Sequence, residues 1–348
     1  MTTPEAPPQP RPPEGARPAA PRIPRLRSLR EHRWSATDRA IVVCFLAIAM
    51  GVLFLASYSL LLGDPVPRHI DAALVGDPTA HAATVDTAQS VADGSLVFSQ
   101  YASVPAALHA MDEQHAYATL DLTSATPTLY VASAAGASVA RVLEGIAAVD
   151  PTVRVVDTHP LGPADPNGLE IFYLMLVPTI IGFITFLQIS AHAAGLSLRR
   201  WTAIMVGLAV VASLVFTLVD GPLLHRLSLP LLQTWGILTL QLVAVASFAS
   251  LMLVLIGRWA LLPTWTFFTI LGNSASGGAV APPLLPEPFA FVSRWLPSGA
   301  TVDALREAVY FPSYQHAQPI AVLAAWATAL LATMLLVSRR RRKSPAHD

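Results

Sequence analysis

Residues 171–191 read IFYLMLVPTIIGFITFLQISA and contain no Asp, Glu, Lys or Arg. Three more stretches share this property and follow at short intervals: Trp201–Leu218, Leu231–Ile256 and Trp259–Leu271. About 20 apolar residues, at about 1.5 Å per residue, span a hydrocarbon core of about 30 Å. Because the backbone must satisfy its own hydrogen bonds in that solvent, these stretches are predicted to be transmembrane helices. A buried helix of a soluble core remains an alternative only for the fourth stretch, which is short.

The composition also indicates a membrane protein. The chain has 348 residues, of which 53% are hydrophobic and 13% are charged, whereas soluble domains carry about 25% charged residues. The only cysteine, Cys44, lies in an apolar run. No disulfide within one chain is therefore available, even for parts that face an oxidising compartment.

The N-terminal region changes character before its apolar run. Residues 1–39 are rich in Pro, Ala and Arg, and we expect a disordered cytoplasmic tail there. Residues 40–63 contain no Asp, Glu, Lys, Arg or His, and these 24 residues correspond to a helix of about 36 Å. The apolar core of a signal peptide is shorter, at about 7–15 residues. We therefore predict an uncleaved first transmembrane helix.

Residues 64–170 have the alternating pattern of a small α/β domain. Because the domain follows the first helix, it is predicted to be extracytoplasmic. About 105 residues are enough for one small core. The expected strands are 70–75, 95–101, 116–122, 127–132 and 152–157, and the expected helices are 79–93, 104–114 and 135–149.

The region before the last span is looser. Residues 272–318 are predicted to form an outer Gly/Pro loop with two short helices, 289–296 and 302–310, and Thr301 is the expected N-cap of the second. Residues 277–286 fit either a re-entrant gate or an exposed loop. We favour a structural role at the outer leaflet, with Phe289, Phe291 and Trp295 as an interfacial aromatic belt.

These segments predict an α-helical polytopic membrane protein. It has six transmembrane helices and a small mixed α/β extracytoplasmic domain between helices one and two. The expected spans are 40–63, 171–191, 201–218, 231–256, 259 to about 280 and 319–337, so residues 171–337 form a five-helix transmembrane domain. The residues after the last span, 338–348, are predicted to be a basic tail.

The basic residues predict the orientation. Six crossings place both termini, Arg199–Arg200, Arg258 and the cluster Arg339–Lys343 on one side of the membrane. The positive-inside rule makes that side the cytoplasm, and the protein is expected in the cell (plasma) membrane. With five crossings, the C-terminal arginine cluster would lie outside.

Two stretches resemble a known family. Between the last two spans stand Gly277-Gly278, Pro282-Pro283, Leu285-Pro286, Trp295-Leu296-Pro297 and Ala304-Leu305-Arg306-Glu307-Ala308-Val309-Tyr310-Phe311. In the outer domain, Tyr117-Ala118-Thr119-Leu120 is followed by residues 129–138. Together with the order of the spans, these stretches resemble the phage infection protein (YhgE/Pip) group, which belongs with the membrane subunits of type-2 ABC exporters.

The resemblance implies a permease subunit that exports a hydrophobic or amphipathic substrate. It also implies a homodimer or heterodimer and a separate ATPase, which would dock near Arg199–Arg200 or on the segment before Ala40. A membrane-anchored extracytoplasmic binding or scaffold protein of the cell envelope is the alternative. Five clustered spans are more than an anchor needs, which favours the permease.

The sequence indicates neither an enzyme nor a cofactor. A P-loop requires a lysine after a Gly-rich turn, and the only lysine, Lys343, lies in the basic tail. The histidines of the outer domain lack metal-ligand spacing, and no catalytic residues or metal ligands are predicted. The arginine-rich ends fit anionic lipid headgroups rather than nucleic acid.

Polar and turn-forming residues in or beside the spans are the candidates for pathway-lining or gating positions. Such groups mark either a pathway or a contact between helices. Gln241 is the deepest of them and the strongest candidate. The full set is Gln188, His192, Gln233, Gln241, Asn273, Gly277, Gly278, Pro286 and Arg306.

Overall fold

The computed structural model describes residues 35–63, 65–192 and 195–343. The chain divides into two compact units, Met1–Ala47 and Ile48–Asp348, and the boundary lies inside helix α1 (Ala36–Leu62). α1 begins at a capping box, in which Ser35 and Asp38 exchange side-chain to backbone hydrogen bonds of 2.9 and 3.0 Å. The helix therefore starts four residues earlier than predicted, and residues 1–34 of the predicted tail lie outside the described residues.

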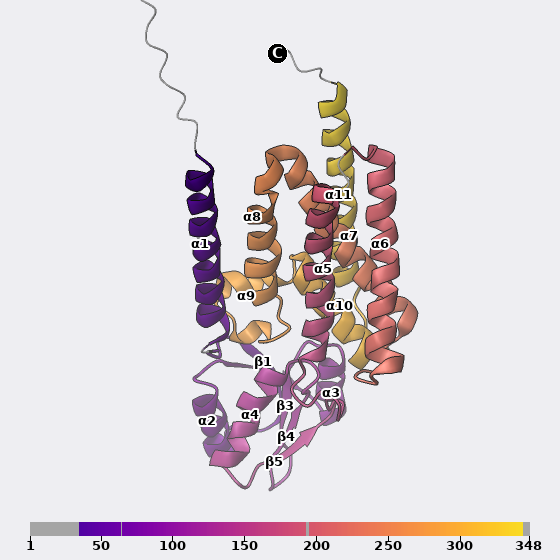
Figure 1. Cartoon of the computed structure of the whole chain (residues 1–348). Helices are drawn as coiled ribbons and strands as arrows, with labels where there is room; N and C mark the ends of the chain where they lie inside the picture. The colour runs from indigo at the N-terminus through magenta and orange to yellow at the C-terminus, as the bar shows by residue number, and fades with distance from the viewer. Residues whose placement is uncertain (1–34, 64, 193–194, 344–348) are drawn as a thin grey trace, which may run out of the picture. The chain divides into compact units, whose positions relative to one another are not determined.

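The predicted α/β domain is present, with every expected element (Figure 1). Its sheet has the order β2-β1-β3-β4-β5, in which only the β3–β4 pair is antiparallel. The strands are β1 (Ile70–Gly76), β2 (Leu96–Tyr101), β3 (Ala118–Leu122), β4 (Thr128–Val131) and β5 (Arg154–Asp157), and the helices are α2 (Ala82–Val91), α3 (Val104–Asp112) and α4 (Ala137–Val149).

Alternation along the strands divides the domain core between the two faces of the sheet. Ala72 and Leu74 of β1 pack with α2 and α4 on one face, whereas Ala73 and Val75 pack with α3 on the other. Successive strand residues point to opposite faces, so a strand buried on both faces reads as a continuous apolar run. This explains why β1 has the sequence Ala-Ala-Leu-Val at its centre.

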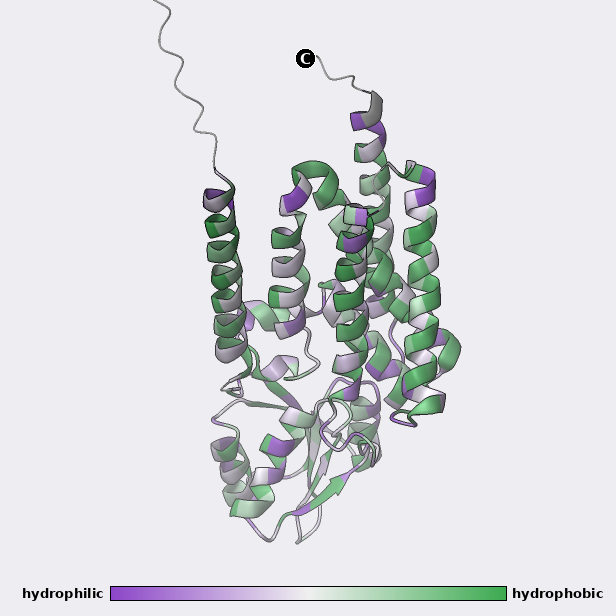
Figure 2. Cartoon of the chain, in the orientation of Figure 1, coloured by the Kyte–Doolittle hydropathy of each residue, from purple (hydrophilic) through white to green (hydrophobic). Residues whose placement is uncertain are grey.

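Four long helices form most of the bundle: α5 (Glu170–His192), α6 (Leu198–Leu218), α7 (Leu231–Ile256) and α11 (Ala317–Lys343). Apolar residues run along these helices and become sparser at their ends (Figure 2). α7 is central and contacts α5, α6 and α11. Gly182 of α5 permits a close approach to α7, because a Cβ there would lie 3.0 Å from a methyl group of Val245. α11 continues through Arg339 to Lys343, so the start of the predicted basic tail extends the helix.

The helical run that continues from α7 to Asn273 folds back on itself. Gly257 has a φ of +61°, which favours glycine, and a short 3-10 turn, η2 (Gly257–Ala260), follows it. The returning arm consists of α8 (Leu261–Thr264) and a π-helix, η3 (Trp265–Asn273). Phe248 stacks on Phe267 with ring centroids 5.3 Å apart. These residues would be about 28 Å apart along a straight helix, so the two arms are antiparallel.

The segment before α11 departs most from prediction. It contains η4 (Pro282–Leu284), α9 (Glu287–Ser293) and α10 (Pro297–Tyr310). Residues 277–286 are not an exposed loop, because Val280, Ala281, Leu284 and Leu285 belong to the core of the α/β domain. The predicted cap is also wrong. α10 begins at Pro297, and Thr301 lies inside it.

Five helical runs among the described residues are long and apolar enough to cross a membrane, which is the pattern of a polytopic membrane protein. One of these runs is the folded-back stretch Leu231–Asn273, of 43 residues. In the predicted fifth span, 259 to about 280, the residues up to Asn273 form the end of η2 and this returning arm, and residues 275–280 are not helical.

Candidate functional site

A polar cleft lies between the α/β domain and helices α9, α10 and α11. Its volume is about 360 Å³, which is within the range of small-molecule sites. Tyr117 comes from the residue before β3, and α10 contributes Asp303, Arg306 and Glu307. The cleft is therefore assembled from segments that are about 190 residues apart in the sequence.

Arg306 anchors one wall of the cleft. Its Nη1 lies 3.0 Å from Asp303 Oδ1, its Nη2 donates to the Gly277 carbonyl at 2.8 Å, and only 12% of its side chain is exposed. Two of the predicted residues, Arg306 and Gly277, thus contact each other. Gly277 has a φ of +73°, a conformation that favours glycine. Burial raises the pKa of Asp303, and the Arg306 guanidinium opposes that shift.

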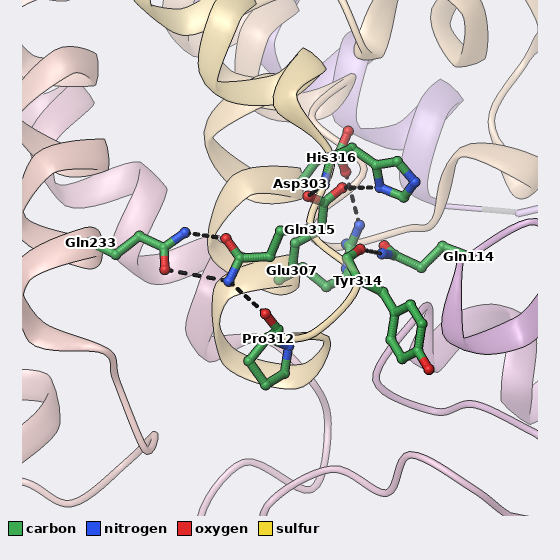
Figure 3. Close-up of polar contacts among 9 residues, drawn as sticks. Gln114, Gln233, Asp303, Glu307, Pro312, Tyr314, Gln315 and His316 are labelled. Atoms are coloured by element: carbon green, nitrogen blue, oxygen red, sulfur yellow. Dashed lines mark hydrogen bonds and ion pairs between the residues drawn. The ribbon is translucent and has the colours of Figure 1, made fainter. Parts of the chain in front are cut away.

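Glu307 closes the turn from α10 into α11. It accepts the His316 backbone N–H at 2.7 Å, and its other carboxylate oxygen lies 3.0 Å from His316 Nδ1 (Figure 3). Only 8% of the Glu307 side chain is exposed. The same turn is held at both sides, because Gln114 donates to the Tyr314 carbonyl and Gln233 pairs with Gln315. Gln233 therefore joins α7 to the turn, close to the cleft.

Two further side chains complete the cleft. Burial raises the pKa of Tyr117 to about 12, so the phenol keeps its proton and can donate a hydrogen bond. Arg294 is exposed, and its guanidinium carbon lies 5.7 Å from the centre of the Phe291 ring. Within the described part of the chain, no carboxylate lies within ion-pair distance of Arg294.

Inside the helical bundle, Gln241 of α7 joins its own helix to α5 and α10. Its Nε2 donates to Thr179 Oγ1 of α5 at 3.0 Å, and its Oε1 lies 3.1 Å from Thr301 Oγ1 of α10. All three side chains are fully buried. We call Thr179, Gln241 and Thr301 the Gln241 trio. α10 connects this trio with the cleft, because Thr301 and the charged residues of the cleft stand on the same helix.

Asn273 lies at a second buried position, where η3 meets α10. The Tyr58 hydroxyl approaches its side chain, but neither amide atom has a hydrogen-bond partner of normal geometry in the described structure. Thr269 Oγ1 and Ser298 Oγ are also buried without a partner there. We call Thr269, Asn273 and Ser298 the Asn273 cluster.

The remaining predicted residues do not join these groups. The Gln188 side chain and His192 are exposed at the far end of α5, where His192 Nδ1 lies 3.0 Å from the Gln188 carbonyl. Gly278 packs against Phe172, since a Cβ at that glycine would lie 2.9 Å from the ring. Pro286 is the residue that precedes α9.

Asp220 is a buried acidic residue that is absent from the predicted set. It is 6% exposed in the π-helix η1 (Val219–Leu223). Its carboxyl group interacts with that of Glu170, which also pairs with Arg226 at 3.2 Å. The sequence Asp-Gly-Pro after α6 indicates an irregular helix end, and it was the available signal for this buried carboxyl group. The Glu307–His316 pair was also missed, because it depends on a turn with no recognisable motif.

Compared with protein families, curated proteins and solved structures, the chain shows no significant similarity to any of them.

Proposed function

We propose that the chain is a permease subunit of the plasma membrane, similar to type-2 ABC exporters, which exports a hydrophobic or amphipathic molecule with a separate ATPase. The observation that carries the proposal is the segment between the returning arm and α11. α10 is buried against α5, α7 and α11 instead of lying on the surface. A simple anchor has no need of a polar helix held inside its bundle, whereas a permease needs an element between the outer cleft and the spans.

The proposal includes six crossings with both termini in the cytoplasm. The reversal at Gly257 supports it, because the returning arm and the non-helical residues after it lead back toward the α/β domain. Topology can be measured with single cysteines in a Cys44→Ser background. We expect Gln100→Cys to react with an impermeant reagent in intact cells, and Arg258→Cys and Ser344→Cys to react only after lysis. A Ser344→Cys that reacts in intact cells while Arg258→Cys stays protected would refute the sixth crossing.

The partner ATPase is tested by isolating the tagged chain from its own host with gentle crosslinking. We expect a dimer and a co-isolated ATPase, whose recovery falls in an Arg199→Glu/Arg200→Glu variant. The matched control is Arg141→Glu/Arg154→Glu in the α/β domain, which should not change recovery. A monomeric chain that never captures an ATPase would argue against the permease.

The second candidate is an extracytoplasmic binding or scaffold protein. The polar cleft favours it, because a site beside the α/β domain can recognise a ligand without transport. The domain shares its core with residues 280–285 and with Phe311, so an excised domain would lack part of its core. Binding must therefore be tested on the full chain. Ligand binding by a chain that forms no complex with an ATPase would favour this second function.

A further inference from the structure

The rim of the cleft lies at the level where α11 enters the apolar bundle. Arg294 and Gln318 are both exposed there, and the Gln318 side chain donates to the Arg294 carbonyl at 3.0 Å. Next to them, the Phe291 and Trp295 side chains are 62% and 49% exposed. Exposed aromatic residues beside a basic residue are typical of the membrane–water interface. The rim is therefore expected at the depth of lipid headgroups.

Trp295 is held at this level by α11. Its backbone carbonyl accepts the Trp326 indole N–H at 2.8 Å, and its side chain remains outside the bundle. An apolar chain in the adjacent leaflet can therefore lie against Phe291 and Trp295 while the group at its end enters the cleft.

The charges inside the cleft indicate what that group carries. Asp303 is paired with Arg306, and Glu307 is paired with His316. Arg294 forms no direct ion pair among the described residues of the cleft, and its charge acts on Asp303 only at longer range. Guanidinium groups bind phosphate and carboxylate through charge-assisted hydrogen bonds, and the Tyr117 phenol supplies a further donor.

We propose that the cleft binds the anionic headgroup of an amphipathic molecule in the outer leaflet, with Arg294 as its charge partner. The unoccupied lone pairs of the Asp303 and Glu307 carboxylates favour a headgroup that also has hydroxyl donors. A volume of about 360 Å³ holds a headgroup but not its acyl chains. That this molecule is the exported cargo rests on the proposed function, whereas its binding does not.

Binding is measured on the full chain, without ATPase or nucleotide, by titration and native mass spectrometry. Three probes separate the sources of the anion: phosphatidylglycerol in phosphatidylcholine nanodiscs, phosphatidylcholine nanodiscs alone, and soluble glycerol phosphate. The test variants are Arg294→Ala, which removes the charge, and Gln318→Trp, which fills the rim and keeps the charge. The control is Arg258→Ala, because Arg258 is also exposed and lies 5.3 Å from the ring of Trp259.

We expect saturable binding of phosphatidylglycerol, about tenfold weaker in Arg294→Ala and in Gln318→Trp and unchanged in Arg258→Ala. Equal binding of phosphatidylcholine would overturn the requirement for an anion, and equal binding of glycerol phosphate would overturn the requirement for an apolar chain. If Gln318→Trp binds like the wild type, the anion is held by surface charge and the cleft is not its site. No ATPase is present in this binding measurement, so a negative result would not affect the co-isolation experiment. A failure to co-isolate an ATPase would likewise leave the binding result valid.

Discussion

The Gln241 trio and the Asn273 cluster are equally buried, but they differ in how their polar atoms are paired. In the trio, each hydroxyl bonds a carbonyl four residues earlier in its own helix and also contacts Gln241. In the cluster, four side-chain atoms have no hydrogen bond of normal geometry among the described residues, although the Tyr58 hydroxyl approaches Asn273. Each unpaired buried polar atom costs about 1–3 kcal/mol.

This difference separates two kinds of contact made by the same helix. α10 meets α5 and α7 through the satisfied trio, and it meets η3 through the unsatisfied cluster. We infer that the first contact fixes the position of α10 and that the second is the weaker one. In a permease, the arm that carries η3 is then the element expected to move, or to accept the polar part of a passing molecule.

The largest effect is expected for Gln241→Ala. This substitution leaves a cavity between three helices and removes both bridging hydrogen bonds, so we expect a loss of about 2–4 kcal/mol in the free energy of unfolding. The measurement is denaturant-induced unfolding in bicelles. Gln188→Ala is the control, because that side chain is exposed, and its effect should stay within about 0.5 kcal/mol. Equal effects of the two substitutions would show that the trio does not stabilise the packing of its three helices.

Gly272→Ala tests the contact between η3 and α10. A Cβ there would lie 2.8 Å from Ser298 Oγ and 3.1 Å from the Phe267 carbonyl, so we expect a loss of about 1–3 kcal/mol. Gly236→Ala is the matched control in α7. No atom lies within 4 Å of its added Cβ, and alanine is favoured in a helix by about 0.5–1 kcal/mol. Ser298→Ala should partly rescue Gly272→Ala, and additive effects would indicate that the two residues do not meet.

Sequence patterns predicted the α/β domain almost completely, and the physical reason is local. Each strand and helix of that domain has its own period of buried residues, so its existence does not depend on distant segments. The four long helices of the bundle were predicted for a similar reason, because length and lack of charge define a span without reference to its neighbours.

Residues 261–316 were predicted less well, because their structure depends on tertiary contacts. The π-helix η3 and the burial of α10 have no signature in local periodicity. The loop at Val280–Leu285 is apolar because it completes a core more than 100 residues away in the sequence. Gln241 was singled out as the deepest polar residue of the spans, yet its partners, Thr179 and Thr301, were not predicted, since threonine is common in membrane helices.

Asn273→Leu is expected to have a smaller effect, of opposite sign. Leucine has a similar shape and removes two unpaired buried amide atoms, so we expect a gain of about 1 kcal/mol in the free energy of unfolding. Gln241→Leu is the corresponding change in the trio, and there we expect a loss of about 1 kcal/mol, as for hydrogen bonds between membrane helices. The two leucine variants, measured under the same bicelle conditions, should therefore differ in sign. A destabilised Asn273→Leu protein would mean that Asn273 forms a stabilising hydrogen bond, with the nearby Tyr58 hydroxyl as the first candidate.

The smallest effect is expected where a polar group is satisfied but only partly buried, as at Asp150. Hydrogen bonds from the Thr152 hydroxyl and backbone N–H lower the pKa of Asp150 below its usual value of 3.8, and the Thr84 hydroxyl adds to this shift. A carboxyl group whose pKa is lower in the folded state contributes stability above its unfolded pKa and loses it as the pH falls through the folded pKa. The unfolding midpoint of the full chain should therefore decrease less below about pH 4 in Thr152→Val than in the wild type. Thr152→Ser, which keeps the hydroxyl, should follow the wild type. Identical acid profiles for the valine and serine variants would show that this hydroxyl does not stabilise the ionised carboxylate.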